Sequence, residues 1–145
     1  MTKTKVIFLC THNSARSQIA EAFLSKEAGD YFDVYSGGYD PKPIHPMAIQ
    51  VMKEIGIDIS GQQPKDLWQL SRTEYFGIAI TVCKKGEEAD CPTIAGTSTR
   101  LYWNIDDPAS FEGTDAEKLA KFRQVRDLIH EHIESFLKDR KIKKG

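Results

Sequence analysis

A cysteine, an arginine and a serine stand close together near the start of the chain, between an apolar run and an amphipathic one. The apolar run 6–9 ends at Cys10, and Arg16 and Ser17 follow after five intervening residues. A strand followed at once by a helix would aim the backbone N–H groups of the turn, and the positive end of the helix dipole, into one concavity. Such a concavity binds a tetrahedral oxyanion, and the planar guanidinium of Arg16 can hold two of its oxygens.

The same loop predicts that Cys10 is a nucleophile. Arg16 and the helix start favour the thiolate, which is the reactive form of cysteine. Ser17 can donate a hydrogen bond to this thiolate, and we also expect it to open the helix. A cysteine at a strand end is often only a small buried apolar residue. The Cys-X5-Arg-Ser spacing between a strand and a helix favours the nucleophile, and the chain has no Gly-X4-Gly-Lys-Ser/Thr nucleotide-binding motif.

Strands and helices alternate along the rest of the chain. This alternation predicts an α/β fold in three layers, with a doubly wound sheet of four parallel strands, right-handed crossovers and helices on both faces. The predicted strands are 6–9, 33–36, 76–82 and 99–103. The predicted helices run from the Cys10 loop to Ala28, from Pro46 to Gly56 with Ile55 in the core, over a short turn at 65–70, and from a Thr114–Glu117 capping box to the end of the chain.

Further reactive side chains are expected at the sheet edge that carries Cys10, because parallel strands present their carboxyl ends together. Cys83 directly follows strand 76–82, and Asp106 and Asp107 lie in the loop after strand 99–103. Two thiols would therefore meet at one site. Cys91 comes after the polar segment 84–90, which predicts a mobile surface loop.

Composition and charge exclude several classes of partner. The 145 residues, 40% of them hydrophobic, suffice for one core, so we expect a single domain over 1–145. With 20 basic and 21 acidic residues, nothing indicates binding to nucleic acid or to a membrane surface. No signal peptide or membrane span is predicted, so we expect a cytoplasmic location. In that reducing compartment, we expect that the three cysteines do not form a framework of structural disulfides. No metal centre is predicted, because His45, His130 and His132 have no partners at ligand spacing.

Residues 10–21, Cys-Thr-His-Asn-Ser-Ala-Arg-Ser-Gln-Ile-Ala-Glu, resemble the active-site loop of the low-molecular-weight protein tyrosine phosphatase superfamily. They are most similar to its thioredoxin-coupled arsenate reductase branch, and the resemblance covers nearly the whole chain. It implies a role in arsenical resistance. Cys10 would form an adduct with arsenate, Cys83 would attack Cys10 to release arsenite, and Cys91 would take over the disulfide for reduction by thioredoxin.

The resemblance also implies roles for other residues. Asp107, next to Pro108, corresponds to the family's general acid, and Asp106 is the fallback. Gln62 stands where relatives often carry a histidine that supports the loop. We expect a monomer without a tightly bound cofactor. The oxyanion-binding loop would comprise Thr11, His12, Asn13, Ser14, Ala15, Arg16 and Ser17, with Asn13 holding its shape, and a monovalent cation site would map to Asn13, Glu21, Ser36 and Asp66.

Two other functions stay open. A tyrosine phosphatase would use Cys10, Arg16 and Asp107 alone and would let water hydrolyse a thiophosphate. Relatives of that kind follow the Asp-Pro pair with aromatic residues, whereas this chain has Ala109 and Ser110. A non-catalytic oxyanion-binding or redox-sensing module would not need a general acid, so Asp107 argues against it. The later cysteines favour the reductase, because only the reductase uses them.

Overall fold

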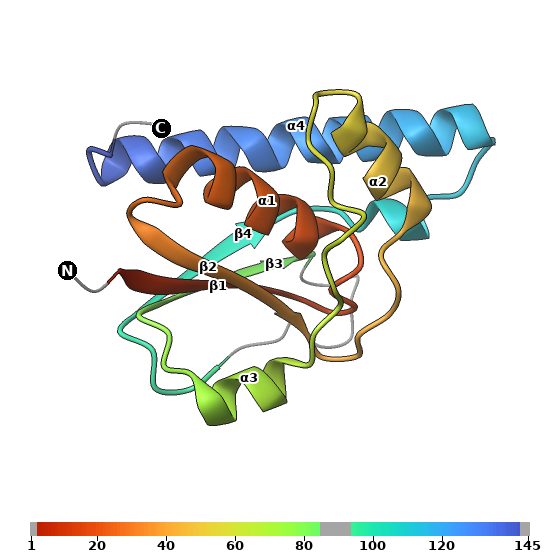
Figure 1. The fold of residues 1–145 in the computed structure, drawn as a ribbon. Coiled ribbons are helices and arrows are strands. Elements are labelled where there is room, and N and C mark those ends of the chain that lie inside the picture. Colours follow the sequence, from red (N-terminus) through yellow and green to blue (C-terminus); the bar gives the residue numbers. More distant parts are fainter. Residues whose placement is uncertain (1–2, 85–93, 143–145) are drawn as a thin grey trace.

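A four-stranded parallel sheet forms the centre of the molecule. The computed structural model describes residues 3–84 and 94–142, and in this part of the chain the strand order is β2-β1-β3-β4 with every pair parallel. Helices lie on both faces of the sheet (Figure 1), so the predicted three-layer α/β fold is confirmed. The strands are β1 (Thr4–Cys10), β2 (Phe32–Gly38), β3 (Ile78–Cys83) and β4 (Thr99–Asn104).

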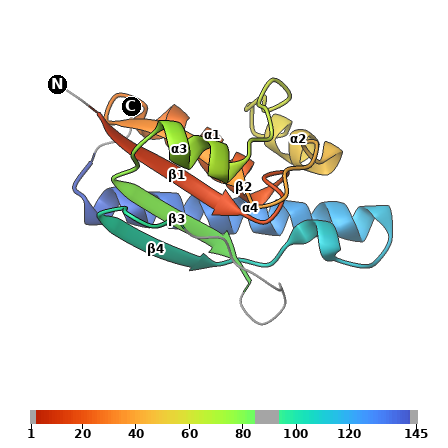
Figure 2. The same ribbon diagram turned by 90° about the horizontal axis from the view of Figure 1, so that it is seen from below.

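The helices divide unequally between the two faces. Of the helices in the described ranges, α1, α2 and α4 lie on one side of the sheet and only α3 lies on the other, as Figures 1 and 2 show. The buried core divides in the same way, into a large cluster under α1, α2 and α4 and a small one under α3. The helices are α1 (Arg16–Ala28), α2 (Pro46–Lys53), α3 (Leu67–Thr73) and α4 (Asp115–Asp139), with a 3-10 turn η1 (Pro108–Ser110) before α4.

The apolar run of β1 explains why this strand is central. Successive side chains of a strand point to opposite faces of the sheet, so Val6 and Phe8 join the large cluster while Ile7 and Leu9 join the small one. All of them are fully buried. A strand covered on both faces needs a continuous apolar sequence, and Cys10 is the last residue of this buried strand.

Local signals set the helix ends, with one exception to the sequence prediction. The Thr114 capping box is present, with Thr114 Oγ1 accepting from Glu117 N and Glu117 Oε1 accepting from Thr114 N. His45 caps α2, as its Nδ1 accepts from Met47 N at 3.1 Å. The assignment of Ile55 to the core is wrong, because α2 ends at Lys53 and the Ile55 side chain, beyond that end, is 40% exposed.

His130 joins α4 to α1, and the expectation that it has no partner at ligand spacing is wrong. Its Nε2 lies 2.7 Å from Glu27 Oε1 and 3.4 Å from Glu134 Oε1. Its ring stacks on Phe23 with a centroid separation of 4.4 Å. Glu134 is one helical turn away in the sequence, but Glu27 comes from α1 and only the fold brings it close. A hydrogen bond between the two helices accounts for this arrangement.

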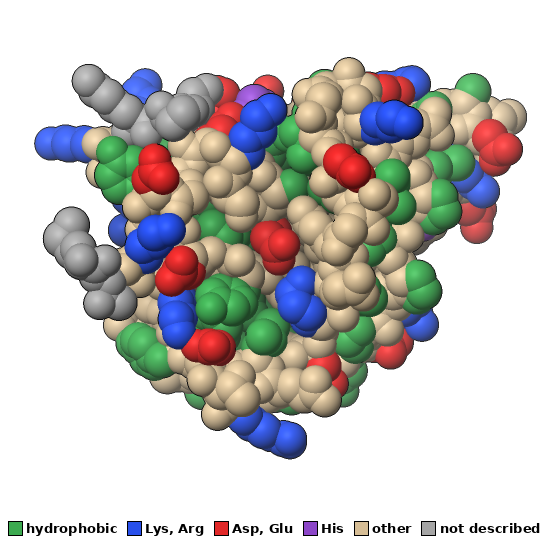
Figure 3. Space-filling model, viewed as in Figure 1, with side chains coloured by type: hydrophobic (Ala, Val, Ile, Leu, Met, Phe, Trp, Pro, Cys, Tyr) green, Lys and Arg blue, Asp and Glu red, His purple; other side chains and the backbone are tan. Residues whose placement is uncertain are grey.

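The surface carries charges of both signs. On the face seen in Figure 3, basic and acidic side chains are interspersed, and apolar side chains lie between them. Among the described residues, no helix is both long enough and apolar enough to cross a membrane.

Candidate active site

Cys10 lies at the carboxyl end of β1, where the chain turns into α1. Its side chain is 2% exposed, and two groups contact the sulfur. The backbone N–H of Asn13 donates to Cys10 Sγ at 3.2 Å, and Ser17 Oγ lies 2.8 Å from the same sulfur. These two contacts orient the sulfur within the loop.

The role predicted for Ser17 is half confirmed. Asn13 Nδ2 donates to Ser17 Oγ at 2.7 Å, which leaves the hydroxyl proton of Ser17 available for the Cys10 sulfur. Ser17 does not open α1. The helix begins at Arg16, the capping position belongs to Ala15, and no side chain caps the helix; the Ser17 hydroxyl contacts Cys10. A bound oxyanion can accept the N–H groups that a capping side chain would otherwise satisfy.

Arg16 connects this loop to the segment after β4. Its side chain is 3% exposed, and its Nη1 donates to the Ile105 carbonyl at 3.0 Å. Its Nη2 lies 3.8 Å from Asp107 Oδ2. The guanidinium is therefore fixed in orientation, with a carboxyl group beside it. The arginine expected to bind the anion and the aspartate expected to act as the acid therefore lie side by side.

The two neighbouring aspartates differ in their surroundings. Asp106 accepts from Lys121 Nζ at 2.7 Å and pairs with Lys84 Nζ at 3.0 Å, and these lysines hold the pKa of the Asp106 carboxyl below its usual value. A carboxyl group kept ionised in this way is a poor proton donor. Asp107 makes a local contact, in which its Oδ1 accepts from Ala109 N at 3.0 Å, and it faces Arg16. The geometry favours Asp107 as the acid.

Two glutamines, Gln18 and Gln62, support the Cys10 loop, and only Gln62 was expected from the sequence. Gln18 Nε2 donates to both Asn13 O and Asn13 Oδ1, at 3.0 and 2.9 Å. Gln62 Nε2 in turn donates to Gln18 Oε1 at 2.6 Å. Gln62 thus supports the loop through Gln18, although it does not contact Asn13 itself. Gln18 was missed because nothing in its position suggests a contact with the loop that precedes it.

The chain after β2 runs along the loop and binds its carbonyl groups. Thr11, His12 and Ser14 each accept from a backbone N–H of this segment, at distances of 2.8 to 3.0 Å. The backbone of Asn13 has a φ of 51°, a left-handed conformation that asparagine tolerates better than most residues. Together these contacts fix the loop from outside. The N–H groups belong to Asp40, Lys42 and His45.

Substituting Gly38 with alanine should distort the loop. A Cβ on Gly38 would lie 2.8 Å from Asn13 N and 2.9 Å from the carbonyl carbon of His12, so the backbone must move. We expect an unfolding free energy lower by about 1–3 kcal/mol and a kcat/KM lower by roughly 100-fold, since small displacements of reacting groups are costly. Denaturant unfolding and steady-state kinetics measure the two effects. Gly61→Ala is the control, because a Cβ there meets nothing within 4 Å, and equal behaviour of the two variants would contradict the role of Gly38.

The second thiol lies on the neighbouring strand. Leu9 of β1 pairs with Thr81 of β3, so Cys10 and Cys83 end adjacent strands, which run about 4.8 Å apart. Cys83 is fully buried and disulfide-bonded, whereas Cys10 is a free thiol. Cys91 and the predicted mobile loop before it fall within or next to 85–93, which lies outside the described residues.

The residues of the expected monovalent cation site have other partners. Asn13 Oδ1 accepts from both Lys65 N and Gln18 Nε2. Asp66 Oδ1 accepts from Trp68 N and so caps α3. Ser36 Oγ donates to Glu21 Oε1, and the ammonium of Lys65 lies 3.5 Å from that same carboxylate oxygen. The ammonium of Lys65 therefore supplies a positive charge beside Glu21, where a monovalent cation was expected. The oxygens expected as ligands are those of Asn13, Glu21, Ser36 and Asp66.

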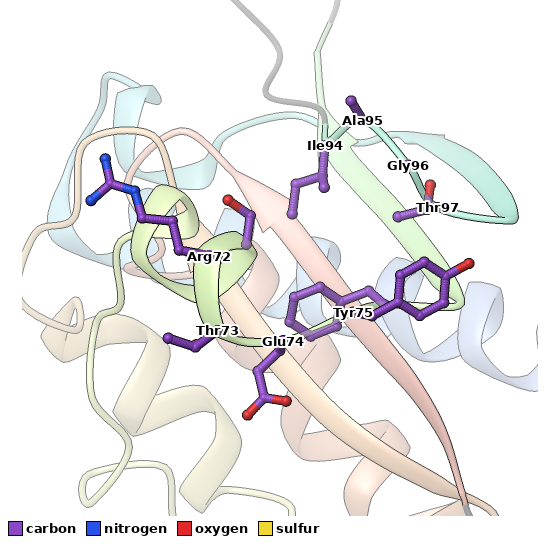
Figure 4. Close-up of a pocket in the computed structure, with 10 residues that line it drawn as sticks. Arg72, Thr73, Glu74, Tyr75, Ile94, Ala95, Gly96 and Thr97 are labelled. Carbon is purple, nitrogen blue, oxygen red and sulfur yellow. The ribbon is translucent and has the colours of Figure 1, made fainter.

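A pocket elsewhere on the molecule lacks these groups. It lies between the end of α3 and the segment before β4, and Figure 4 shows Arg72, Tyr75 and Ile94 among the side chains around it. It contains no residue of the Cys10 loop. The reactive groups are instead gathered at the carboxyl ends of β1, β3 and β4.

Fold and site together define a class of protein, one that holds a cysteine and an arginine in a loop between a parallel strand and a helix. The family model described as low molecular weight phosphotyrosine protein phosphatase matches residues 5–145. The chain belongs to this family.

Individual relatives are more informative about the branch. The arsenate reductase of Halalkalibacterium halodurans is 45% identical over 137 residues, which make up 94% of this chain and 96% of the relative. A solved arsenate reductase in its phosphate-binding state matches with a TM-score of 0.77 and 32% identity, over 94% of this chain and 98% of that chain. The thioredoxin-dependent arsenate reductase of Corynebacterium glutamicum matches with a TM-score of 0.60 and 30% identity, over 91% of this chain and 62% of that chain.

Proposed function

We propose that this protein is an arsenate reductase that converts arsenate to arsenite with thioredoxin as the external reductant. The observation that carries the proposal is the pair of cysteines at the ends of adjacent strands, one a free thiol in an oxyanion-binding loop and the other oxidised. The arsenate reductases among the relatives support the same activity. Hydrolysis of a phosphate ester would require no second thiol.

The first step forms the adduct. The Cys10 thiolate attacks arsenic(V), and a bond between sulfur and arsenic forms. One arsenic–oxygen bond breaks, and the departing oxygen leaves as water after Asp107 gives it a proton. Arg16 and the backbone N–H groups at the start of α1 hold the remaining oxygens and stabilise their charge. Arsenic is still in its +5 state at this stage.

The second step transfers two electrons. The Cys83 thiolate attacks Cys10 Sγ, a disulfide bond forms, and the sulfur–arsenic bond breaks with its electron pair staying on arsenic. Arsenic leaves as arsenite in its +3 state. The Cys91 thiolate then attacks Cys83, which releases the Cys10 thiolate and leaves a Cys83–Cys91 disulfide. A thioredoxin dithiol reduces that disulfide by exchange, and the free Cys10 and oxidised Cys83 of the structure fit the state just before this last step.

The remaining expectations belong to the same proposal. The chain acts as a single domain and a monomer in the cytoplasm, without a tightly bound cofactor. The family match over residues 5–145 supports the single domain.

Phosphatase activity is the second candidate, because Cys10, Arg16 and Asp107 suffice to form and hydrolyse a thiophosphate. The family to which the chain belongs supports a residual activity of this kind. Ala109 and Ser110, which follow the Asp107-Pro108 pair, provide no aromatic ring to stack on an aryl group. We therefore propose phosphate ester hydrolysis as a slow side reaction.

One pair of assays tests the proposal. The protein is mixed with arsenate, thioredoxin, thioredoxin reductase and NADPH, and in parallel with a chromogenic aryl phosphate. We expect NADPH consumption that depends on arsenate and on thioredoxin, in step with arsenite formation. Rapid aryl phosphate hydrolysis without such consumption would identify a phosphatase, and neither reaction would identify an oxyanion-binding or redox-sensing module.

A further inference from the structure

A carboxylate beneath the active-site loop is matched by a lysine from another part of the chain. Glu21 lies on α1, and its side chain is 16% exposed. Its Oε1 accepts from Ser36 Oγ at 2.7 Å and lies 3.5 Å from Lys65 Nζ. Lys65 Nζ also donates to the Gln63 carbonyl at 2.7 Å. A carboxylate largely removed from water needs a positive partner, or its charge is strongly destabilising.

The backbone of Lys65 is fixed to the same loop. Lys65 N donates to Asn13 Oδ1 at 2.8 Å, and Lys65 O accepts from Gly38 N at 2.8 Å. Asn13 in turn contacts Ser17, which contacts Cys10 Sγ. A side-chain substitution at Lys65 leaves its two backbone contacts in place, so the role of the ammonium can be tested separately from that of the backbone.

Two of the oxygens expected to hold a monovalent cation here already accept hydrogen bonds. Asn13 Oδ1 accepts two N–H groups, and Asp66 Oδ1 accepts the N–H of Trp68. The positive charge next to Glu21 comes from a side chain. A cation in solution would have to displace the ammonium of Lys65, which is held next to the site at a high effective concentration.

We propose that Lys65 is a positioning residue whose tethered ammonium takes the place of a bound monovalent cation against Glu21, so that the active-site loop keeps its shape without one. The arsenate readout of this proposal rests on the proposed function, but the other readouts do not. The ammonium of Lys65 acts on Glu21, and the backbone N–H of the same residue holds Asn13, so Lys65 affects the loop without touching the substrate.

The central test compares Lys65→Met with the wild type in potassium chloride and in tetramethylammonium chloride at equal ionic strength. The wild type should reduce arsenate equally fast in both salts. Lys65→Met should be slower by about tenfold in tetramethylammonium, the factor expected for one lost charge-assisted contact. Potassium should restore much of this loss, because a small cation can enter the space left beside Glu21, whereas tetramethylammonium is too large.

Two further variants separate position from charge. Lys65→Arg should remain close to the wild type in both salts, because the charge beside Glu21 is kept. Lys42→Met is the matched control. Lys42 lies on the outer side of the same loop, and its exposed ammonium pairs with Asp40 at 3.4 Å, so we expect no salt-specific effect on its activity.

Two readouts do not depend on arsenate turnover. The first is the rate at which iodoacetamide alkylates Cys10 and the protection against it by inorganic phosphate, which report the shape of the loop. The second is the midpoint of thermal unfolding, which potassium should raise for Lys65→Met but not for the wild type. If arsenate reduction is absent while these readouts behave as expected, the proposed function fails and the role of Lys65 stands.

Three results would overturn the role of Lys65. One is a wild type that needs potassium for full activity or phosphate protection. Another is a Lys65→Met variant that equals the wild type in both salts. The third is a folded Lys65→Met variant whose loss is relieved neither by potassium nor by the change to arginine, because its defect would then not be the missing charge.

Discussion

A Cys91→Ser variant should reduce arsenate once and then stop. Cys83 can still attack the Cys10 adduct and release arsenite, but nothing then resolves the Cys10–Cys83 disulfide. The expected yield is one arsenite per protein molecule, against continuous turnover in the wild type. Arsenite measured after a single mixing, followed by alkylation and peptide mapping of the trapped disulfide, checks this result.

The other two cysteines provide matched comparisons. Cys83→Ser should release no arsenite by the thioredoxin route, since no thiol then attacks Cys10. Both variants should keep the aryl phosphate hydrolysis of the wild type, whereas Cys10→Ser should lose both activities because its alcohol is a poor nucleophile. Normal thioredoxin-dependent turnover by Cys83→Ser and Cys91→Ser would refute the relay and leave the phosphatase as the better assignment.

An Arg16→Lys variant should lose roughly 10²–10³-fold in kcat/KM for arsenate and for aryl phosphate, although it keeps the positive charge. Lysine cannot hold two oxygens of the anion with a planar fork of donors. It would also have to replace the contact of Arg16 with the Ile105 carbonyl, which orients the guanidinium beside Asp107. Steady-state kinetics with both substrates measure the loss.

Arg123→Lys is the control for this substitution. Arg123 lies on α4, where it pairs with Glu54 at 2.7 Å, away from the oxyanion loop. The same chemical change should therefore leave kcat/KM almost unaltered. If Arg16→Lys behaved like Arg123→Lys, Arg16 would be a structural residue and not the clamp for the anion.

The sequence predicted the parts of this molecule whose cause is local. The burial of β1 follows from its continuous apolar run, the start of α4 from the Thr114–Glu117 pair, and the contact between Ser17 and Cys10 from the Cys-X5-Arg-Ser spacing. Each of these involves residues that lie within seven positions of one another along the chain. The parallel sheet followed from the alternation of strands and helices.

The parts that the sequence did not reveal depend on contacts between distant segments. Lys65 lies 44 residues after Glu21 along the chain. The pairing of Gly38 with the segment before α3 brings the ammonium of Lys65 next to the Glu21 carboxylate. Gln18 was missed because it folds back onto Asn13 from inside α1. The prediction that Ser17 opens α1 failed because the helix already begins at Arg16, so Ser17 lies within its first turn.

The two faces of the sheet are covered by helices to different extents, and this difference affects how the enzyme unfolds. The cost of local opening rises with the apolar contacts that must be broken. Beneath the short α3, the buried cluster is much smaller than the one beneath α1 and α4. Because Lys65 precedes α3 and holds Asn13, opening of this side removes a support of the catalytic loop while the helices opposite are still packed. On heating, the molecule should therefore pass through an inactive form with most of its native structure, and its thermal inactivation precedes its melting.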